Sequence, residues 1–290
     1  MGGGGKFKLK KWYLIIDVEK CEDCNNCFLS CKDEHVGNDW TGYSLSQPLH
    51  GHRWINIMRK ERGQYPLIDV SYLPTPCMHC DSAPCIKAAK NGELYKREDG
   101  IVMIDPEKAR GKREIQKSCP YGAIWWNEEK DVPQKCTFCA HLLDEGWDKP
   151  RCVQACPTGA LRAILKDETA FKKIVEEEKL EVLKPERNTH PRIYYKNLFR
   201  FTRCFIGGSV AHKEDGKTDC SEGATVTLFK NSEKVNEMIT DNFGDFKFDN
   251  LEENSGKYTL EVLYRDFEKK RVEVDLKESV NIGEILFEKG

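Results

Sequence analysis

The sequence lacks the features that would place the chain in a membrane or on a nucleic acid. No apolar run approaches the ~20 residues that a membrane-spanning helix needs. The first residues, MGGGGKFKLKKWYLIIDVEK, contain no apolar signal core and no twin arginine, so we expect no export signal, a cytoplasmic location and flexible glycines at positions 2–5. The formal net charge of −2 shows no basic excess, so we expect neither a nucleic acid nor a membrane anchor among the partners.

Cysteine, by contrast, is abundant. The chain has 14 cysteines in 290 residues, and all but Cys204 and Cys220 lie between Cys21 and Cys156. In a short secreted chain this density would predict disulfides. This chain is long, has no expected export signal and arranges its cysteines in C-x2-C groups, so the pattern favours metal binding.

The spacing of these groups indicates iron–sulfur clusters. The stretch CEDCNNCFLSC has the C-x2-C-x2-C-x3-C spacing of bacterial [4Fe–4S] ferredoxins, in which the fourth cysteine binds the other cluster of a pair. Three closely spaced cysteines wrap one cubane, whereas the fourth begins the next helix and faces away. The other groups are CMHCDSAPC, the CPYGA that begins at Cys119, and CTFC followed by RCVQACPTGA.

This exchange of the fourth ligand predicts three complete four-cysteine sites that bind iron. The first site is predicted to use Cys21, Cys24, Cys27 and Cys156. The second site is predicted to use Cys31, Cys136, Cys139 and Cys152. The third site is predicted to use Cys77, Cys80, Cys85 and Cys119. We therefore expect three [4Fe–4S] clusters, with the remaining two cysteines as unligated thiols.

A fourth site is missing as a whole. The C-x2-C-x2-C-x3-C spacing would put a cysteine at position 89, four residues after Cys85. Counting back from Cys119 with the same spacing would put three more at positions 115, 112 and 109. These positions hold Ala89, Ile115, Lys112 and Ala109. Because all four belong to the same hypothetical cluster, the pattern indicates the removal of one complete site.

Zinc is the alternative metal. C-x2-C pairs often bind Zn²⁺ in closed tetrahedral sites. The longer cysteine runs and the paired Cys-Pro elements are poor zinc signatures, however, so iron–sulfur chemistry is favoured.

These residues resemble the iron–sulfur subunits of the molybdenum and tungsten bis-pterin oxidoreductases, the dimethyl-sulfoxide-reductase family. The motifs CPYGA, CPTGA and IDPEKARG stand where that family has them, and the resemblance covers residues 12 to about 200. It implies an α+β fold with a double ferredoxin-like module, in a heterodimer with a large subunit that holds molybdopterin with molybdenum or tungsten. The missing cluster would be the one that faces a membrane quinol partner, so its absence fits an enzyme without a membrane anchor.

Further stretches of the sequence extend this resemblance to one type of enzyme within the family. GHRW, PTPCMHC and PRIYYKNLFRF are similar to the small subunit of a transhydroxylase that acts on hydroxylated aromatics and combines three clusters with an additional C-terminal β domain. Related catechol dehydroxylases and resorcinol hydroxylases could share such a subunit, and the sequence does not separate these possibilities.

Two domains are predicted along the chain. Residues 1–207 form the ferredoxin-like domain, with an insertion at 32–76 whose stretch NDWTGYSLSQPLHGHRW is expected to be a long structured loop that docks a large subunit or covers the clusters. Residues 208–290 contain short alternating runs such as GATVTLFK and GKYTLEVLY, which predict a small all-β sandwich or barrel. It resembles transthyretin-like and carboxypeptidase-regulatory domains, and a packing or interface role is expected, with carbohydrate or surface binding as the alternative.

Local patterns in the first domain predict further elements. WYLIIDV, at 12–18, is expected to be a strand, and residues 167–182 an amphipathic helix. GIVMIDPEKAR predicts a strand and then a helix with Asp105 as its N-cap and Pro106 in its first turn. His79 is expected to be exposed, or else to donate a hydrogen bond to a cluster sulfur. Aromatic side chains expected to pack in the core or at an interface are Trp125, Trp126, Tyr194 and Tyr195.

The expected function is electron transfer. Iron–sulfur clusters carry single electrons, and the sequence has no motif for a pterin, a flavin or a nucleotide, so no catalytic residue is expected in this chain. The active site is expected on the large partner. An independent polyferredoxin-type carrier is the alternative, which the insertion and the added β domain disfavour.

Overall fold

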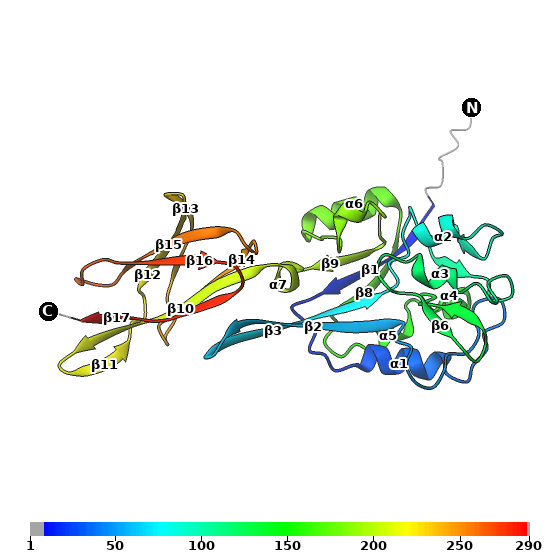
Figure 1. The fold of residues 1–290 in the computed structure, drawn as a ribbon, viewed down its shortest axis with the longest axis horizontal. Helices are drawn as coiled ribbons and strands as arrows, with labels where there is room; N and C mark the ends of the chain where they lie inside the picture. Colours follow the sequence, from blue (N-terminus) through cyan, green and yellow to red (C-terminus); the bar gives the residue numbers. More distant parts are fainter. Residues whose placement is uncertain (1–8, 289–290) are drawn as a thin grey trace, which may run out of the picture. The chain divides into compact units, whose positions relative to one another are not determined.

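The computed structural model describes residues 9–288 of the chain, so the expectation for glycines 2–5 lies outside the described residues. The chain divides into two compact units (Figure 1). The first contains the residues up to Met58 together with Tyr72–Leu198, and the second contains Arg59–Ser71 together with the chain from Phe199 onward. Residues 59–71 of the insertion therefore belong to the same unit as the C-terminal residues.

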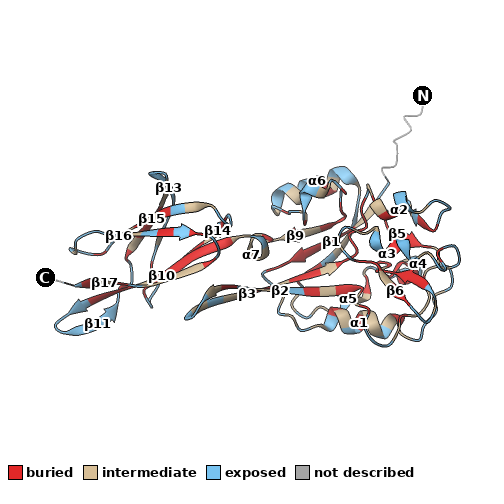
Figure 2. Ribbon diagram, in the orientation of Figure 1, coloured by how far each residue is buried: buried red, intermediate tan, exposed pale blue. Residues whose placement is uncertain are grey.

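A three-stranded sheet forms the centre of the first unit. Its middle strand β1 (Lys11–Asp17) pairs antiparallel with β8 (Leu161–Lys166) and parallel with β9 (Ile193–Lys196). Residues 13–17 of β1 are buried (Figure 2), and the first four have apolar or aromatic side chains that cover both faces of the sheet, whereas the last is Asp17. The strand predicted at 12–18 is confirmed.

Helix α6 (Glu168–Glu177) covers one face of this sheet, where Phe171 stacks on Tyr13 of β1 with 3.6 Å between ring centroids. The helix begins where predicted because the Asp167 carboxylate accepts hydrogen bonds from the backbone N–H groups of the first turn. It ends earlier than predicted, and Lys179 just beyond it has a left-handed φ of 53°.

Short elements surround the sheet and carry the cysteine groups. The helices are α1 (Asn26–His35), α2 (Pro84–Ala88), α3 (Glu114–Lys117), α4 (Ala140–Asp144), α5 (Arg151–Gln154) and the 3₁₀ turn η1 (Pro185–Arg187). Two hairpins pair β4 (Leu94–Lys96) with β5 (Val102–Ile104), and β6 (Trp125–Asn127) with β7 (Val132–Gln134). Trp126 and Tyr195 are buried, as expected for core residues.

The helix predicted after β5 is wrong. The Asp105 side chain does accept hydrogen bonds from the backbone N–H groups of Glu107 and Lys108, at 3.1 and 3.2 Å, as an N-cap would. Only turns follow, because Gly111 takes a left-handed φ of 72°, and the next helix starts at Glu114.

The insertion combines a loop with a hairpin. Residues 37–54 have little regular structure and are held by the isolated bridges Val36↔Gln47 and Trp40↔Ser44, so the structured loop predicted here is confirmed. Strands β2 (Ile55–Gln64) and β3 (Leu67–Pro76) then form a two-stranded sheet, which was not predicted.

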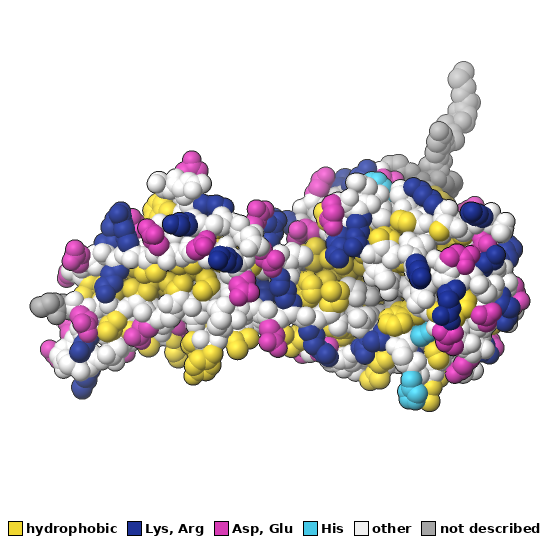
Figure 3. All heavy atoms as spheres, in the orientation of Figure 1, with side chains coloured by type: hydrophobic (Ala, Val, Ile, Leu, Met, Phe, Trp, Pro, Cys, Tyr) yellow, Lys and Arg dark blue, Asp and Glu magenta, His cyan; other side chains and the backbone are white. Residues whose placement is uncertain are grey.

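The second unit is mostly β, as predicted. One four-stranded sheet contains β10 (Cys204–Glu214), β11 (Lys217–Cys220), β14 (Asp245–Leu251) and β17 (Val280–Glu288). The other contains β12 (Thr225–Lys230), β13 (Glu233–Ile239), β15 (Gly256–Leu263) and β16 (Lys270–Leu276), and the short helix α7 is Phe199–Thr202. Side chains of both sheets, including Ile206, Phe248 and Leu260, form one hydrophobic core. On the face shown in Figure 3, charged side chains of both signs are interspersed with hydrophobic ones.

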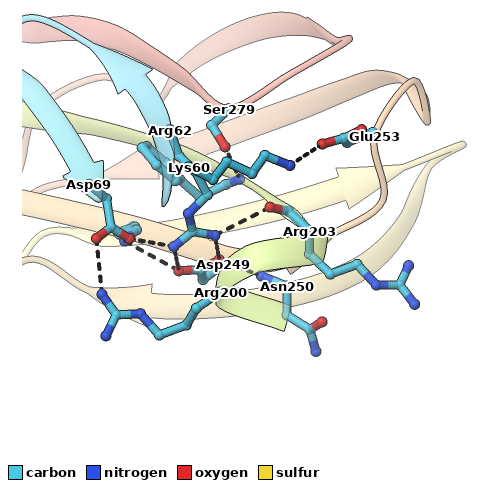
Figure 4. Close-up of polar contacts among 11 residues, drawn as sticks. Lys60, Arg62, Asp69, Arg200, Arg203, Asp249, Asn250, Glu253 and Ser279 are labelled. Atoms are coloured by element: carbon cyan, nitrogen blue, oxygen red, sulfur yellow. Dashed lines mark hydrogen bonds and ion pairs between the residues drawn. The ribbon is translucent and has the colours of Figure 1, made fainter. Parts of the chain in front are cut away.

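A buried arginine joins the β2–β3 hairpin to this core (Figure 4). The Arg62 side chain is 1% exposed and donates from both terminal nitrogens to the Asp249 carboxylate, at 2.9 and 3.1 Å, and also to Asp69. Lys247 and Arg200 bind Asp69 as well, with nitrogen–oxygen distances of 2.8 and 3.0 Å. The network lies wholly within the second unit and pairs a desolvated charge with two carboxylates, which is what burial of an arginine requires.

Candidate iron–sulfur sites

The four cysteines predicted for the second site line one cavity of the first unit: Cys31, Cys136, Cys139 and Cys152. They come from distant segments, because helix α1, which carries Cys31, packs against helix α5, which carries Cys152. Apart from the thiols and a few polar side chains the lining is apolar, with Leu14, Ile55 and Phe138 among the residues that enclose it.

The four cysteines predicted for the third site line a second cavity: Cys77, Cys80, Cys85 and Cys119. Cys85 begins helix α2 together with Pro84, whereas Cys119 follows helix α3. Val102 of β5 and Ile124 close the cavity with apolar side chains.

The cysteines predicted for the first site also lie near one another. Burial, together with the charges of Cys21, Cys24 and Cys156, raises the pKa of the Cys27 thiol to about 12. Cys24 is exposed, so this group lies closer to solvent than the other two.

Burial shifts the titration of the thiols in the two cavities. It raises the pKa of Cys80 and Cys139 to about 12, and that of Cys85 and Cys136 to about 11. Such thiols are protonated at neutral pH, whereas metals bind the thiolate, so metal binding here has to release protons. A cationic metal centre also compensates for bringing several thiolates together in an apolar cavity.

Left-handed backbone conformations shape the cysteine loops. Positive φ angles occur at Asp23 and Asn25 on either side of Cys24, at His79 before Cys80, and at Phe138 and Cys139. These turns direct backbone N–H groups towards sulfur: that of Phe138 donates to Cys136 Sγ at 3.4 Å. The N–H of Ala123 donates to Cys119 Sγ, also at 3.4 Å. Loops of this kind stabilise negative charge on sulfur.

Side chains also contact the sulfur atoms, and sequence reasoning missed them. Gln47 Nε2 donates to Cys31 Sγ at 3.7 Å, and the Thr158 hydroxyl lies 3.7 Å from Cys156 Sγ. A hydrogen bond from Thr189 lowers the pKa of Cys80, although burial and the charge of Cys77 raise it more. Gln47 and Thr189 lie outside the cysteine motifs, so spacing alone carries no signal for them.

His79 is buried, so the expectation that it is exposed is wrong. Its left-handed backbone turns the ring inwards, where it packs edge-on against Phe138 with 5.5 Å between ring centroids. Its Nδ1 accepts a hydrogen bond from the backbone N–H of Val102 at 3.0 Å.

The four positions of the missing site hold no cysteine. Ala109 and Ile115 are buried, and Ala89 and Lys112 are half-buried.

Among residues 9–288, no three His, Cys, Asp or Glu side chains converge closely enough to hold a single metal ion. Over the same residues, no helix is both long and apolar enough to cross a membrane.

Comparison with known proteins agrees with the cysteine pattern. Residues 68–167 match the family described as a 4Fe-4S dicluster domain. The small subunit of pyrogallol hydroxytransferase from Pelobacter acidigallici is 51% identical over 257 residues, which cover 88% of this chain and 91% of that protein. The chain belongs to the pyrogallol hydroxytransferase small-subunit family.

Relatives of this family include subunits of other enzymes. The arsenate respiratory reductase iron–sulfur subunit of Shewanella is 29% identical over 64% of this chain and 96% of its own length. A chain of the tetrathionate reductase of Salmonella typhimurium is 31% identical over 65% of this chain and 73% of its own length. The predicted resemblance to transhydroxylase small subunits and to the dimethyl-sulfoxide-reductase family is therefore confirmed.

Solved structures match this chain only weakly. A 5-hydroxyisourate hydrolase from Klebsiella pneumoniae is 15% identical over 30% of this chain and 87% of its own, with a TM-score of 0.25.

Proposed function

We propose that this chain is the electron-transfer subunit of a molybdopterin enzyme that acts on hydroxylated aromatics, of the pyrogallol–phloroglucinol transhydroxylase type. The observation that carries the proposal is the lining of the two cavities, each by four cysteines from separate segments. The pyrogallol hydroxytransferase relative supports the choice of enzyme.

Three [4Fe–4S] clusters are the proposed cofactors, with iron held by the three predicted sets of cysteines. The thiols of the second and third sets already surround shared cavities, and those of the first set influence one another's ionisation. When bound, such clusters accept and release single electrons.

The residues of this chain would support electron transfer in three ways. The cysteines supply thiolate ligands and hand their protons to solvent when metal binds. Apolar neighbours such as Leu14 and Val102 exclude water from the cavities. The backbone N–H groups of Phe138 and Ala123 stabilise charge on sulfur.

The chemistry on the substrate is assigned to a large partner subunit that binds molybdopterin with molybdenum or tungsten. In this proposal the two chains form a cytoplasmic heterodimer, and no residue of this chain is catalytic. The proposed architecture is a double ferredoxin-like module followed by a β-sandwich, and the two four-stranded sheets that share one core in the second unit support the sandwich. Small subunits of catechol dehydroxylases or resorcinol hydroxylases are the alternative within the family.

Metal analysis of the protein purified anaerobically from its native source tests the proposal. We expect molybdenum or tungsten on a co-purifying large chain, and about twelve irons on this chain at four per cluster. Iron on an isolated chain would instead support an independent carrier. Zinc in place of iron would overturn the proposal.

A further inference from the structure

Gln47 is held in a fixed position beside one of the proposed ligands. The residue is 4% exposed, and its backbone N–H donates to the His35 carbonyl at 2.8 Å. It also forms the bridge with Val36 that ties the loop of residues 37–54 to the end of helix α1. These contacts direct its side-chain amide towards helix α1, where Nε2 donates to Cys31 Sγ.

This hydrogen bond favours negative charge on the sulfur. A side-chain N–H that donates to a thiolate sulfur stabilises its negative charge, and Gln47 Nε2 lies 3.7 Å from Cys31 Sγ. The other donors to the cysteines of this cavity include the backbone N–H of Phe138, which a substitution leaves in place. The contribution of Gln47 comes from a side chain and can therefore be removed.

We propose that Gln47 is a positioning residue that raises the reduction potential of the cluster held by Cys31, Cys136, Cys139 and Cys152, by donating a hydrogen bond to the Cys31 sulfur. The inference rests on the proposed ligand set. Reduction by one electron adds one negative charge to the cluster and its thiolates, and a hydrogen-bond donor stabilises the more negative state. Removing the donor therefore lowers the potential.

The test compares Gln47→Leu with Asn127→Leu in the complete complex. Leucine keeps a similar volume without a donor. Asn127 is a matched control because it is 1% exposed and anchors the same loop, by a bond from Nδ2 to the Ser46 carbonyl at 3.1 Å. In the described residues its side-chain hydrogen bonds go to Ser46, Gln134, Glu129 and Lys130, not to sulfur.

Potentiometric titration followed by electron paramagnetic resonance gives the potential of each cluster. We expect Gln47→Leu to lower the potential of one cluster and to leave the other two unchanged, with no shift in Asn127→Leu. An unchanged set of potentials in Gln47→Leu would overturn the inference, as would an equal shift in the control or a common shift of all three clusters.

A second measurement applies if Gln47→Leu does not load its cluster. Wild-type protein labelled with ¹⁵N in the glutamine side chains is reduced and examined by pulsed electron paramagnetic resonance. A ¹⁵N coupling at one cluster supports the hydrogen bond, and no coupling at any cluster overturns it. Iron content is measured first: wild-type protein without iron contradicts the proposed function itself, whereas full iron content with unshifted potentials contradicts only the role of Gln47.

Discussion

Two arginines of the second unit are expected to contribute differently to its stability, because one is buried and the other is exposed. Arg62 is almost completely buried and binds two carboxylates, whereas Arg203 is 38% exposed in its side chain and pairs with Glu252, which is 71% exposed. A buried charge left without its partner, or a buried carboxylate left without its cation, is costly, while exposed ion pairs contribute little. Charge alone therefore does not predict how much each arginine contributes to the stability of the second unit. The burial of its side chain and of its partners does.

Replacing Arg62 should therefore destabilise the second unit far more than replacing Arg203. We expect Arg62→Ala to lower the free energy of unfolding by about 3–5 kcal/mol, because Asp69 and Asp249 lose their buried donor and keep only the more exposed Lys247 and Arg200. Arg203→Ala should cost about 0–1 kcal/mol. Denaturant unfolding monitored by hydrogen exchange in strand β14 measures both, and equal effects of the two variants would contradict this account.

The same network makes the second unit sensitive to acid. Burial alone would raise the pKa of Asp69, but hydrogen bonds from Lys247 and Arg62 outweigh it and lower that pKa to about 2. Because the ordinary value is 3.8, the stabilisation is complete above about pH 4 and is lost as the pH falls through about 2.

Hydrogen exchange in residues 59–71 should accordingly quicken between about pH 4 and 2, after correction for the intrinsic exchange rate. In Asp69→Asn, which cannot take up this proton, the remaining pH dependence should be smaller. An identical acid response in both proteins would show that Asp69 contributes nothing to it.

At the level of elements, strand β10 shows where sequence reasoning failed. Its Gly207 and Gly208 carry no strand signal, yet β10 pairs with β11, β14 and β17. Glycine is needed because a Cβ at position 208 would lie 2.8 Å from the Gly283 carbonyl oxygen and 2.9 Å from Ile282 Cγ1. The close approach of β17 that requires Gly208 is a tertiary contact and leaves no local pattern.

Gly208→Ala should therefore destabilise the second unit by about 1–3 kcal/mol through overpacking. Ser209→Ala, at the next position of the same strand, should change stability by less than about 0.5 kcal/mol. Thermal unfolding of the two variants makes the comparison, and a neutral Gly208→Ala would show that β17 can move away without cost.

Other elements were predictable because their signals are local. The apolar run of β1, the Asp167 cap of α6 and the alternating strands from β12 onward have the pattern that their structures require. The cysteine groups were found in the same way, by spacing. Gln47 and Thr189 were not, because they reach the cysteines only after the chain has folded.

At the scale of the whole molecule, each cavity draws its cysteines from separate parts of the chain. Cys119 lies in the same cavity as Cys80 although helices α2 and α3 and the β4–β5 hairpin separate them in sequence. The proposed clusters therefore cross-link segments that have no local reason to meet.

Cys119→Ala should consequently damage the same cluster as Cys80→Ala, because each removes one ligand of the third set. Iron content and electron paramagnetic resonance should show one and the same signal lost or altered in both variants. Loss of different signals would mean that the pairing of the cysteine groups is wrong.

Restoring one cysteine of the missing site should have no such effect. Ala89→Cys should create no new cluster, because the three other positions remain Ala109, Lys112 and Ile115. The same spectra test this expectation, and a fourth cluster signal in this single variant would contradict the account of a site lost as a whole.

The placement of the cysteines along the chain also sets an order of maturation. On the proposed ligand sets, the third site has all its ligands once the ribosome has made residue 119. The first and second sites wait for Cys156 and Cys152, although Cys21–Cys31 are among the earliest residues made. On these ligand sets the second site can be completed only after translation reaches Cys152, and the first only after it reaches Cys156, so the third site is the first that can hold a cluster on all four ligands.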